Sequence, residues 1–385
     1  MTPADFLGRV RALLPSVRER TAQAERERRL PEDTVRDFLE AGLFRCLQPK
    51  RYGGYELDPQ IFYQAVIEVA AVCGSTGWIF GVIGIHNWHL ALFPPAAQDD
   101  VWGEDNDVLV STSVAPTGTV EAVPGGFRLR GRWSFSSGCD FCRWAVLGGV
   151  VPGDPPDARV FLVPRRDYEI DDNWHVVGLC GTGSKDLVVE DAFVPEHRTH
   201  SYRDAFEIDS PGAAVNDAPL YRLPWGLTFP YALTAPAIGV ALGALDSFRE
   251  QAATRVVTRD GSRAAEDRFT HLRLAEAAAE VGSAHDRLIA NFAEMMRCLR
   301  GGTDVPLAAR ARYRWDAAKA TDWSVSAVDR VFAMSGGRGI FLGNPLQRAW
   351  RDIHAMQAHA ANNLERAATI FGRSEFGLPP QDLRF

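Results

Sequence analysis

A glycine-rich turn in the middle of the chain, Gly181-Thr182-Gly183-Ser184, has the composition of a phosphate-binding loop. A dinucleotide fingerprint needs a helix that begins at its glycines, and a P-loop needs a Gly-Lys-Ser/Thr triplet. Neither is present. Residues 187–195 instead alternate in polarity and are rich in β-branched side chains, which predicts a strand that ends at Pro195. We interpret the segment as a turn between two strands.

Two short spacings could in principle hold a metal or carry redox chemistry. Cys139 and Cys142 form a C-x-x-C pair, but a structural zinc site needs a second pair, and the sequence has none. His86 and His89 are three residues apart and lack a third ligand. We therefore predict no metal site, assign His89 to packing, and expect the six scattered cysteines to be reduced thiols.

Composition limits the classes of partner. The 385 residues are 46% hydrophobic and carry a formal net charge of −7 without a basic run, which disfavours nucleic acid and anionic membranes. The most apolar window, residues 78–93, is too short and too polar to cross a bilayer. The first residues lack the pattern of a secretory signal, so we expect a cytoplasmic protein that acts on small molecules.

Periodicity divides the chain into three parts. Residues 1–105 have the apolar spacing of helices, and residues 106–207 consist of short alternating runs between Gly and Pro clusters. Residues 208–385 begin with a connector and continue with helical patterns near 227–258, 264–300, 304–335 and 344–371. We predict an α+β multidomain protein with an N-terminal helical domain, a middle antiparallel β domain and a C-terminal four-helix bundle.

This order of domains resembles the acyl-CoA dehydrogenase superfamily. The turn itself is similar to a signature of that superfamily, in which a Trp, here Trp174, precedes Gly-x-x-Gly-Thr-Gly-Ser and a strand that ends in Val-Pro. Where the superfamily usually has Arg, this chain has Cys180. The resemblance implies that the turn closes part of the β domain against a flavin ring and binds no phosphate.

The dehydrogenases of this superfamily use an ionised Glu to remove a proton from an acyl thioester. In the corresponding region no carboxylate follows Asp352 until Glu365, and His359-Ala360-Ala361-Asn362 occupies the place. That run resembles the oxygenase components of two-component flavin-dependent monooxygenases. Four further segments share the resemblance: 73–78, 86–93, 134–140 and 375–380.

The resemblance implies a function. Reduced flavin (FMNH2 or FADH2), made by a separate NAD(P)H:flavin reductase, would react with O2 to a C4a-hydroperoxide that hydroxylates a phenolic, polycyclic substrate. The chain has no NAD(P)H fingerprint of its own. Members of the superfamily assemble as homotetramers with flavin at the interfaces, so we expect the same here.

The resemblance also suggests residues for the site. His359 would accept the phenol proton, since an imidazole is neutral near pH 7, although a surface or interface histidine is the alternative. His86 would line the substrate side, and Ser137 would face flavin N5, although Ser136 and Ser137 could form an ordinary turn. Val114 and Gln357 stand where the steroid-catabolic hydroxylases of this family have Tyr and Arg, so the substrate pocket differs there.

Flavin contacts are expected from two kinds of residue. Arg255 or Arg338 of a neighbouring subunit would bind phosphate, although most arginines are simply solvated. The remaining candidates lie around the ring: Trp78, Ser111, Ser113, Ser136, Ser137, Thr182 and Ser184.

Three other functions stay open at this stage. An acyl-CoA dehydrogenase would keep oxidised FAD bound, an amine N-oxygenase on the same scaffold would need no phenol-activating histidine, and a flavin-binding assembly protein would be non-catalytic. The absence of the dehydrogenase Glu disfavours the first of these.

Overall fold

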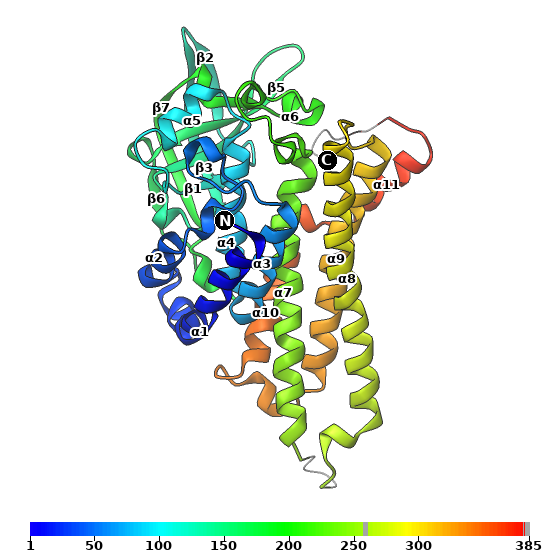
Figure 1. The fold of residues 1–385 in the computed structure, drawn as a ribbon. Helices are drawn as coiled ribbons and strands as arrows, with labels where there is room; N and C mark the ends of the chain where they lie inside the picture. Colours follow the sequence, from blue (N-terminus) through cyan, green and yellow to red (C-terminus); the bar gives the residue numbers. More distant parts are fainter. Residues whose placement is uncertain (257–260, 380, 382–385) are drawn as a thin grey trace.

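The computed structural model describes residues 1–256, 261–379 and 381. Helices pack beside a β domain at one end of the molecule, and long helices run along the other side and project beyond it (Figure 1). The N-terminal region consists of helices α1 (Pro3–Glu27), α2 (Glu32–Glu40), α3 (Pro59–Val72), α4 (Gly74–Leu90) and α5 (Pro95–Trp102). The side chain of Thr2 caps α1, and Pro59 is the first residue of α3, as is common at helix starts.

The β domain contains two four-stranded sheets with the orders β1-β4-β5-β8 and β2-β3-β7-β6. All pairs are antiparallel except β1 with β4, which is parallel. Large apolar side chains such as Trp133 and Phe161 fill the core between the sheets. The strands are β1 (Val110–Ser113), β2 (Thr119–Val123), β3 (Gly126–Ser136), β4 (Trp144–Val151), β5 (Asp157–Pro164), β6 (Glu169–Asp171), β7 (Lys185–Pro195) and β8 (Thr199–Ser201).

The C-terminal region is a bundle of long helices. After the short helix α6 (Tyr202–Glu207) come α7 (Trp225–Thr254), α8 (Arg268–Arg300), α9 (Leu307–Ala333), α10 (Pro345–Gln357) and α11 (Leu364–Glu375). Among the described helices, α7 alone is long and apolar enough to cross a bilayer, yet 89% of its most apolar stretch is buried inside the fold. It is the central helix of the core.

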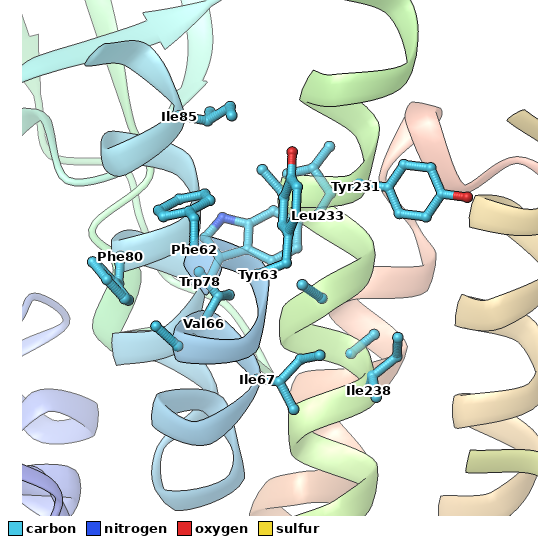
Figure 2. Packing of buried hydrophobic residues seen from close by; sticks show 14 of the residues in the cluster. Phe62, Tyr63, Val66, Ile67, Trp78, Phe80, Ile85, Tyr231, Leu233 and Ile238 are labelled. Atoms are coloured by element: carbon cyan, nitrogen blue, oxygen red, sulfur yellow. The ribbon is translucent and has the colours of Figure 1, made fainter. Parts of the chain in front are cut away.

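Helix α4 packs against both α3 and α7, and every residue from Gly74 to Leu90 is buried. Its glycines permit this contact, because a Cβ at Gly77 or Gly81 would collide with α3 or with the Ala232 carbonyl of α7. Figure 2 shows the aromatic side chains that pack in this layer. The layer fixes the positions of Trp78 and His86, which both belong to α4.

The structure corrects two of the predicted helices. The pattern at 344–371 is two helices, α10 and α11, because Asn362 donates to the Met356 carbonyl and Asn363 caps α11 instead of continuing the turn. His359 lies in this break, at the start of a 3-10 turn over Ala360–Asn362. The pattern at 227–258 ends as helix at Thr254; positions 257 and 258, like Pro380 of the C-terminal segment, lie outside the described residues.

Candidate active site

A chain of buried hydroxyl groups connects α4 to the glycine-rich turn. The indole Nε1 of Trp78 donates to Ser137 Oγ at 3.1 Å. Ser137 Oγ lies 2.7 Å from Ser184 Oγ, and Ser184 Oγ lies 2.7 Å from the Thr182 hydroxyl. We call Ser137, Ser184 and Thr182 the hydroxyl chain. Together with Trp78, it joins residues that are up to 106 positions apart in the sequence.

The turn that carries the hydroxyl chain is anchored at Leu179. This residue has a φ of 54°, in the left-handed region, which is unfavourable for residues other than Gly, Asn and Asp. Its N–H donates to Asp352 Oδ1 of α10 at 2.7 Å, and its carbonyl accepts from the Thr182 hydroxyl at 2.8 Å and from Trp174 Nε1. Three partners therefore hold the strained residue.

Asp352 is a fully buried carboxylate that serves this framework. Its other oxygen lies against the start of α4, where a Cβ at Gly74 would approach it to 2.7 Å. Burial raises the pKa of the Asp352 carboxyl to about 6. Because its contacts are with the Leu179 N–H and with Gly74, this carboxyl supports the turn and is not a substitute for the dehydrogenase Glu.

His359 contacts Trp78, whose indole N–H donates to the hydroxyl chain. The two rings are edge to face with centroids 5.9 Å apart. The ring of His359 is half-buried, and its Nδ1 accepts the Ala361 N–H at 3.1 Å. Burial, and secondly the charge of Arg314, lowers the pKa of His359 to about 4. The neutral ring therefore carries its proton on Nε2 and presents a donor there.

Arg314 of α9 is linked to His359 through Ala361, and the sequence analysis did not name it. It is 4% exposed, donates to the Ala361 carbonyl, and has a second nitrogen, Nη1, without a hydrogen-bond partner. It forms no ion pair within 4.0 Å among the residues that the structure describes. Burial, with Arg366 nearby, lowers the pKa of Arg314 to about 10, so it remains a cation at neutral pH. A single Arg in a helical pattern does not indicate that its side chain is buried.

His86 lies in a second group, on the same helix as Trp78. Both of its ring nitrogens are buried without a hydrogen-bond partner. Burial lowers the pKa of His86 to about 3, so the ring is neutral and offers one donor and one acceptor. Its ring centroid is 5.6 Å from that of Phe229 and 6.3 Å from that of His89, which continues to His200 at 5.9 Å.

The aromatic wall beside His86 reaches Val114. Phe229 stacks on Trp225, whose ring meets Tyr202 edge on, and the Tyr202 hydroxyl donates to the Val114 carbonyl. Gln357, in contrast, is exposed at the end of α10. The structure therefore places Val114 behind this wall and Gln357 outside it.

The other predicted hydroxyl residues lie in the β domain, in β1 and at the end of β3. Ser111 and Ser136 each bury a hydroxyl oxygen without a hydrogen-bond partner, and Ser113 donates to the Ser134 carbonyl. Cys139 and Cys142 are buried free thiols, and burial raises the pKa of Cys139 to about 12. Cys139 is therefore protonated and unreactive, and its thiol contacts the Gly183 carbonyl.

The two phosphate-binding candidates are not part of this site within one chain. Arg255 is the C-cap of α7 and donates to the Met334 carbonyl, far along the helix from Phe229. Arg338 lines an open surface groove of about 710 Å³ at the same end of the bundle, together with Gln251 and Phe341. Next to it, Ile340, Phe341 and Leu342 expose their side chains.

These residues fit an isoalloxazine ring. The edge of that ring carries carbonyl oxygens and nitrogens that need hydrogen-bond partners, and Ser111 and Ser136 of the β domain each bury a hydroxyl oxygen that has no partner. Trp78 and His359 supply ring surfaces next to them. Among the described residues, no group of three or more His, Cys, Asp or Glu is placed to hold a metal.

Comparisons with known proteins agree with this geometry. Residues 6–104 match the N-terminal domain of acyl-CoA dehydrogenases, and residues 231–364 match a C-terminal domain of the same family. The chain is 48% identical to the flavin-dependent monooxygenase oxygenase subunit HsaA of Rhodococcus jostii, over 97% of this chain and 99% of that protein. It is 36% identical to the oxygenase component of an FADH2-dependent resorcinol hydroxylase of a Rhizobium species, over 98% and 95% of the two chains.

A solved structure extends the similarity to three dimensions. The crystal structure of the HsaA monooxygenase from Mycobacterium tuberculosis superimposes with a TM-score of 0.96 at 44% identity, over the full length of both chains. The acyl-CoA dehydrogenase fold is thereby confirmed, and the chain belongs to the family of flavin-dependent monooxygenase oxygenase subunits.

Proposed function

We propose that this protein hydroxylates a phenolic, polycyclic substrate as the oxygenase component of a two-component system. Reduced FMN or FAD, when bound, supplies two electrons and activates O2, so that one oxygen atom enters the aromatic ring and the other leaves as water. The observation that carries the proposal is the contact of His359 with Trp78, whose indole N–H donates to the hydroxyl chain, in the region where the resemblance to the dehydrogenases expects their Glu. The names of the relatives, among them a resorcinol hydroxylase, support the phenolic substrate.

We assign His359 a donor role. The sequence suggested a base, but Nδ1 is occupied by the Ala361 N–H, and a pKa of about 4 makes the ring a weak proton acceptor. The Nε2–H of a neutral imidazole can instead donate a hydrogen bond to an oxygen that gains negative charge during oxygen transfer.

His86 is the better candidate for contact with the phenol. A neutral imidazole without partners on either nitrogen can accept the hydrogen bond of a phenol and donate another. The apolar rings of Phe229 and Trp225 next to it exclude water from the aromatic substrate. Val114 lies behind the same wall, so differences at this position would change the substrate that fits.

The proposed function also implies a partner protein and an oligomeric state. A separate NAD(P)H:flavin reductase would supply the reduced flavin, because both relatives named above are subunits or components of larger systems. We also propose a homotetramer in which Arg338 or Arg255 binds the flavin phosphate of a neighbouring subunit. The groove at Arg338 and the exposed Ile340, Phe341 and Leu342 beside it support an interface at this end of the bundle.

The test combines anaerobic loading with isotope labelling. The protein is mixed with chemically reduced FMN or FAD and then with ¹⁸O2 and a panel of mono- and polycyclic phenols. A hydroxylated product with one ¹⁸O atom is expected. Oxidation of the flavin with release of hydrogen peroxide only, with every phenol tried, would contradict the proposal. Bleaching of bound oxidised flavin by an acyl-CoA without O2 would favour a dehydrogenase instead.

A further inference from the structure

The hydrogen bonds of the hydroxyl chain can run in one direction only. The three oxygen–oxygen distances along it are 2.7 Å from Ser137 to Ser184, 2.7 Å from Ser184 to Thr182, and 2.8 Å from Thr182 to the Leu179 carbonyl. Oxygens this close need a hydrogen between them, and each hydroxyl has one to give. A carbonyl has none, so Thr182 must donate to Leu179, Ser184 to Thr182, and Ser137 to Ser184.

This direction leaves the oxygen of Ser137 as an acceptor. Its hydrogen is committed to Ser184, and one lone pair accepts the Trp78 N–H. The second lone pair is the hydrogen-bonding capacity that remains. The far end of the chain is fixed, because the Leu179 N–H is bound to Asp352 and its carbonyl also accepts from Trp174.

The hydrogen-bonding role of flavin N5 differs between the two oxidation states. N5 is a bare acceptor nitrogen in oxidised flavin and carries a hydrogen in reduced flavin. We propose that the hydroxyl chain makes this site selective for reduced over oxidised flavin, because it holds the Ser137 oxygen as a hydrogen-bond acceptor. The inference rests on the proposed function and on the expectation from the family resemblance that Ser137 faces flavin N5, and it names Ser184 and Thr182 as the residues that set the selectivity.

Removing a hydroxyl group from the hydroxyl chain should reverse the selectivity for reduced flavin. In Ser184→Ala the hydrogen of Ser137 has no acceptor in the chain, so it becomes available to oxidised flavin. In Thr182→Val the hydroxyl of Ser184 loses its acceptor and can turn to donate to Ser137, with the same result. Both variants are therefore expected to bind oxidised flavin more tightly than the wild type, a gain that misfolding cannot produce.

The experiment measures dissociation constants of FMN and FAD in both oxidation states, with the reduced forms titrated anaerobically. A donor–acceptor pair replaced by two facing acceptors changes affinity by about tenfold or more. The dissociation constant of the oxidised flavin divided by that of the reduced flavin should therefore fall by about tenfold in Ser184→Ala and Thr182→Val. Thr112→Val is the matched control, because its buried hydroxyl donates to the Val146 carbonyl and lies outside the chain. Its ratio should match the wild type.

A double variant tests whether the change in the ratio of dissociation constants depends on Ser137. If Ser137 carries it, Ser184→Ala should have no further effect on the ratio in a Ser137→Ala background. An unchanged ratio in both single variants, with reduced flavin still bound by the wild type, would overturn this inference and leave the proposed function standing. Failure of the wild type to bind flavin in either state would overturn both.

Discussion

Arg314 reaches His359 through a single residue, Ala361. Its guanidinium donates to the carbonyl of Ala361, and the N–H of that residue donates to Nδ1 of the His359 ring. The two side chains come from α9 and from the break between α10 and α11. A buried cation without a described carboxylate partner is costly, and here it lies where it fixes both the orientation and the protonation of one imidazole.

This relationship predicts that Arg314→Met raises the pKa of His359. The charge of Arg314 is the second cause of the low value, so the pKa should rise from about 4 toward 6.5 but stay below it, because burial remains. The loss of the Ala361 contact should also mix the two ring tautomers. Histidine labelled with ¹³C and ¹⁵N reports both quantities by NMR in the flavin-free protein, and His359→Gln assigns the signal.

A matched control exists on the same helix. Arg310 is also buried and donates to the carbonyls of Val305 and Phe206, away from His359. Arg310→Met should leave the His359 signal unchanged, while Arg314→Lys, which keeps the charge, should keep the pKa low. Equal changes in Arg310→Met and Arg314→Met would show a general loss of packing instead.

Asp352 should make folding less favourable as the pH rises. Its folded pKa of about 6 lies above the ordinary 3.8, so the folded state binds a proton that the unfolded chain has lost between these values. Stability from this group is therefore present at low pH and is lost as the pH rises through 6. Relative to Asp352→Asn, which keeps an acceptor for the Leu179 N–H, the wild type should lose about 1.4 kcal/mol between pH 5 and pH 7.5.

The measurement is the free energy of unfolding of both proteins in urea at the two pH values. Asp352→Ala serves as the second variant, because it leaves the Leu179 N–H without its acceptor. It should be less stable than Asp352→Asn at both pH values by about 1–3 kcal/mol. A difference between wild type and Asp352→Asn that does not change with pH would refute the assigned pKa.

Buried neutral histidines predict the opposite response below pH 6.5. Burial lowers the pKa of both His86 and His200 to about 3, while the unfolded chain takes up protons from pH 6.5 downward. Their contribution to stability is complete above pH 6.5 and is lost as the pH falls. At pH 5.5 each should lower the free energy of unfolding by about 1.4 kcal/mol, more than the gain of under about 1 kcal/mol from Asp352.

Urea unfolding across pH 5.5 to 7.5 tests this, with His200→Phe as the informative variant. Its ring packs against those of His89 and Phe93, so Phe preserves the aromatic contacts and removes one titrating group together with its hydrogen bond to Ser210. The loss of stability on acidification should shrink by about 1.4 kcal/mol in this variant. An identical loss would mean that His200 is protonated in the folded state.

The sequence predicted the fold well because its signals are local. The proline-started helices, the alternating strands and the glycine-rich turn each have a periodicity or a turn residue that determines them. The convergence of Trp78, Ser137, Ser184 and His359 is different. It depends on how α4, β3, the turn and α10 pack against one another, and the resemblance to a family supplied it where spacing could not.

The missed features depend on single residues in ordinary patterns. Arg314 reads as a solvated position on an amphipathic helix, and only the packing of α9 against the break at 358–363 buries it. The break itself had a signal, since Asn362 and Asn363 are residues whose side chains compete with helical hydrogen bonds. The helical spacing of the apolar residues on both sides of it, in α10 and α11, concealed it.

The separate roles of His86 and His359 lead to the last prediction. His86→Phe keeps the ring packing against Phe229 but removes both hydrogen-bonding nitrogens from the proposed phenol site. It should still bind reduced flavin and consume O2, while the product formed per flavin oxidised falls by about tenfold or more and hydrogen peroxide takes its place. His89→Phe is the control, since His89 neighbours His86 on α4 and was assigned to packing. If His86→Phe kept full coupling to product, the phenol would have to bind elsewhere, and His359 would again be the candidate for its partner.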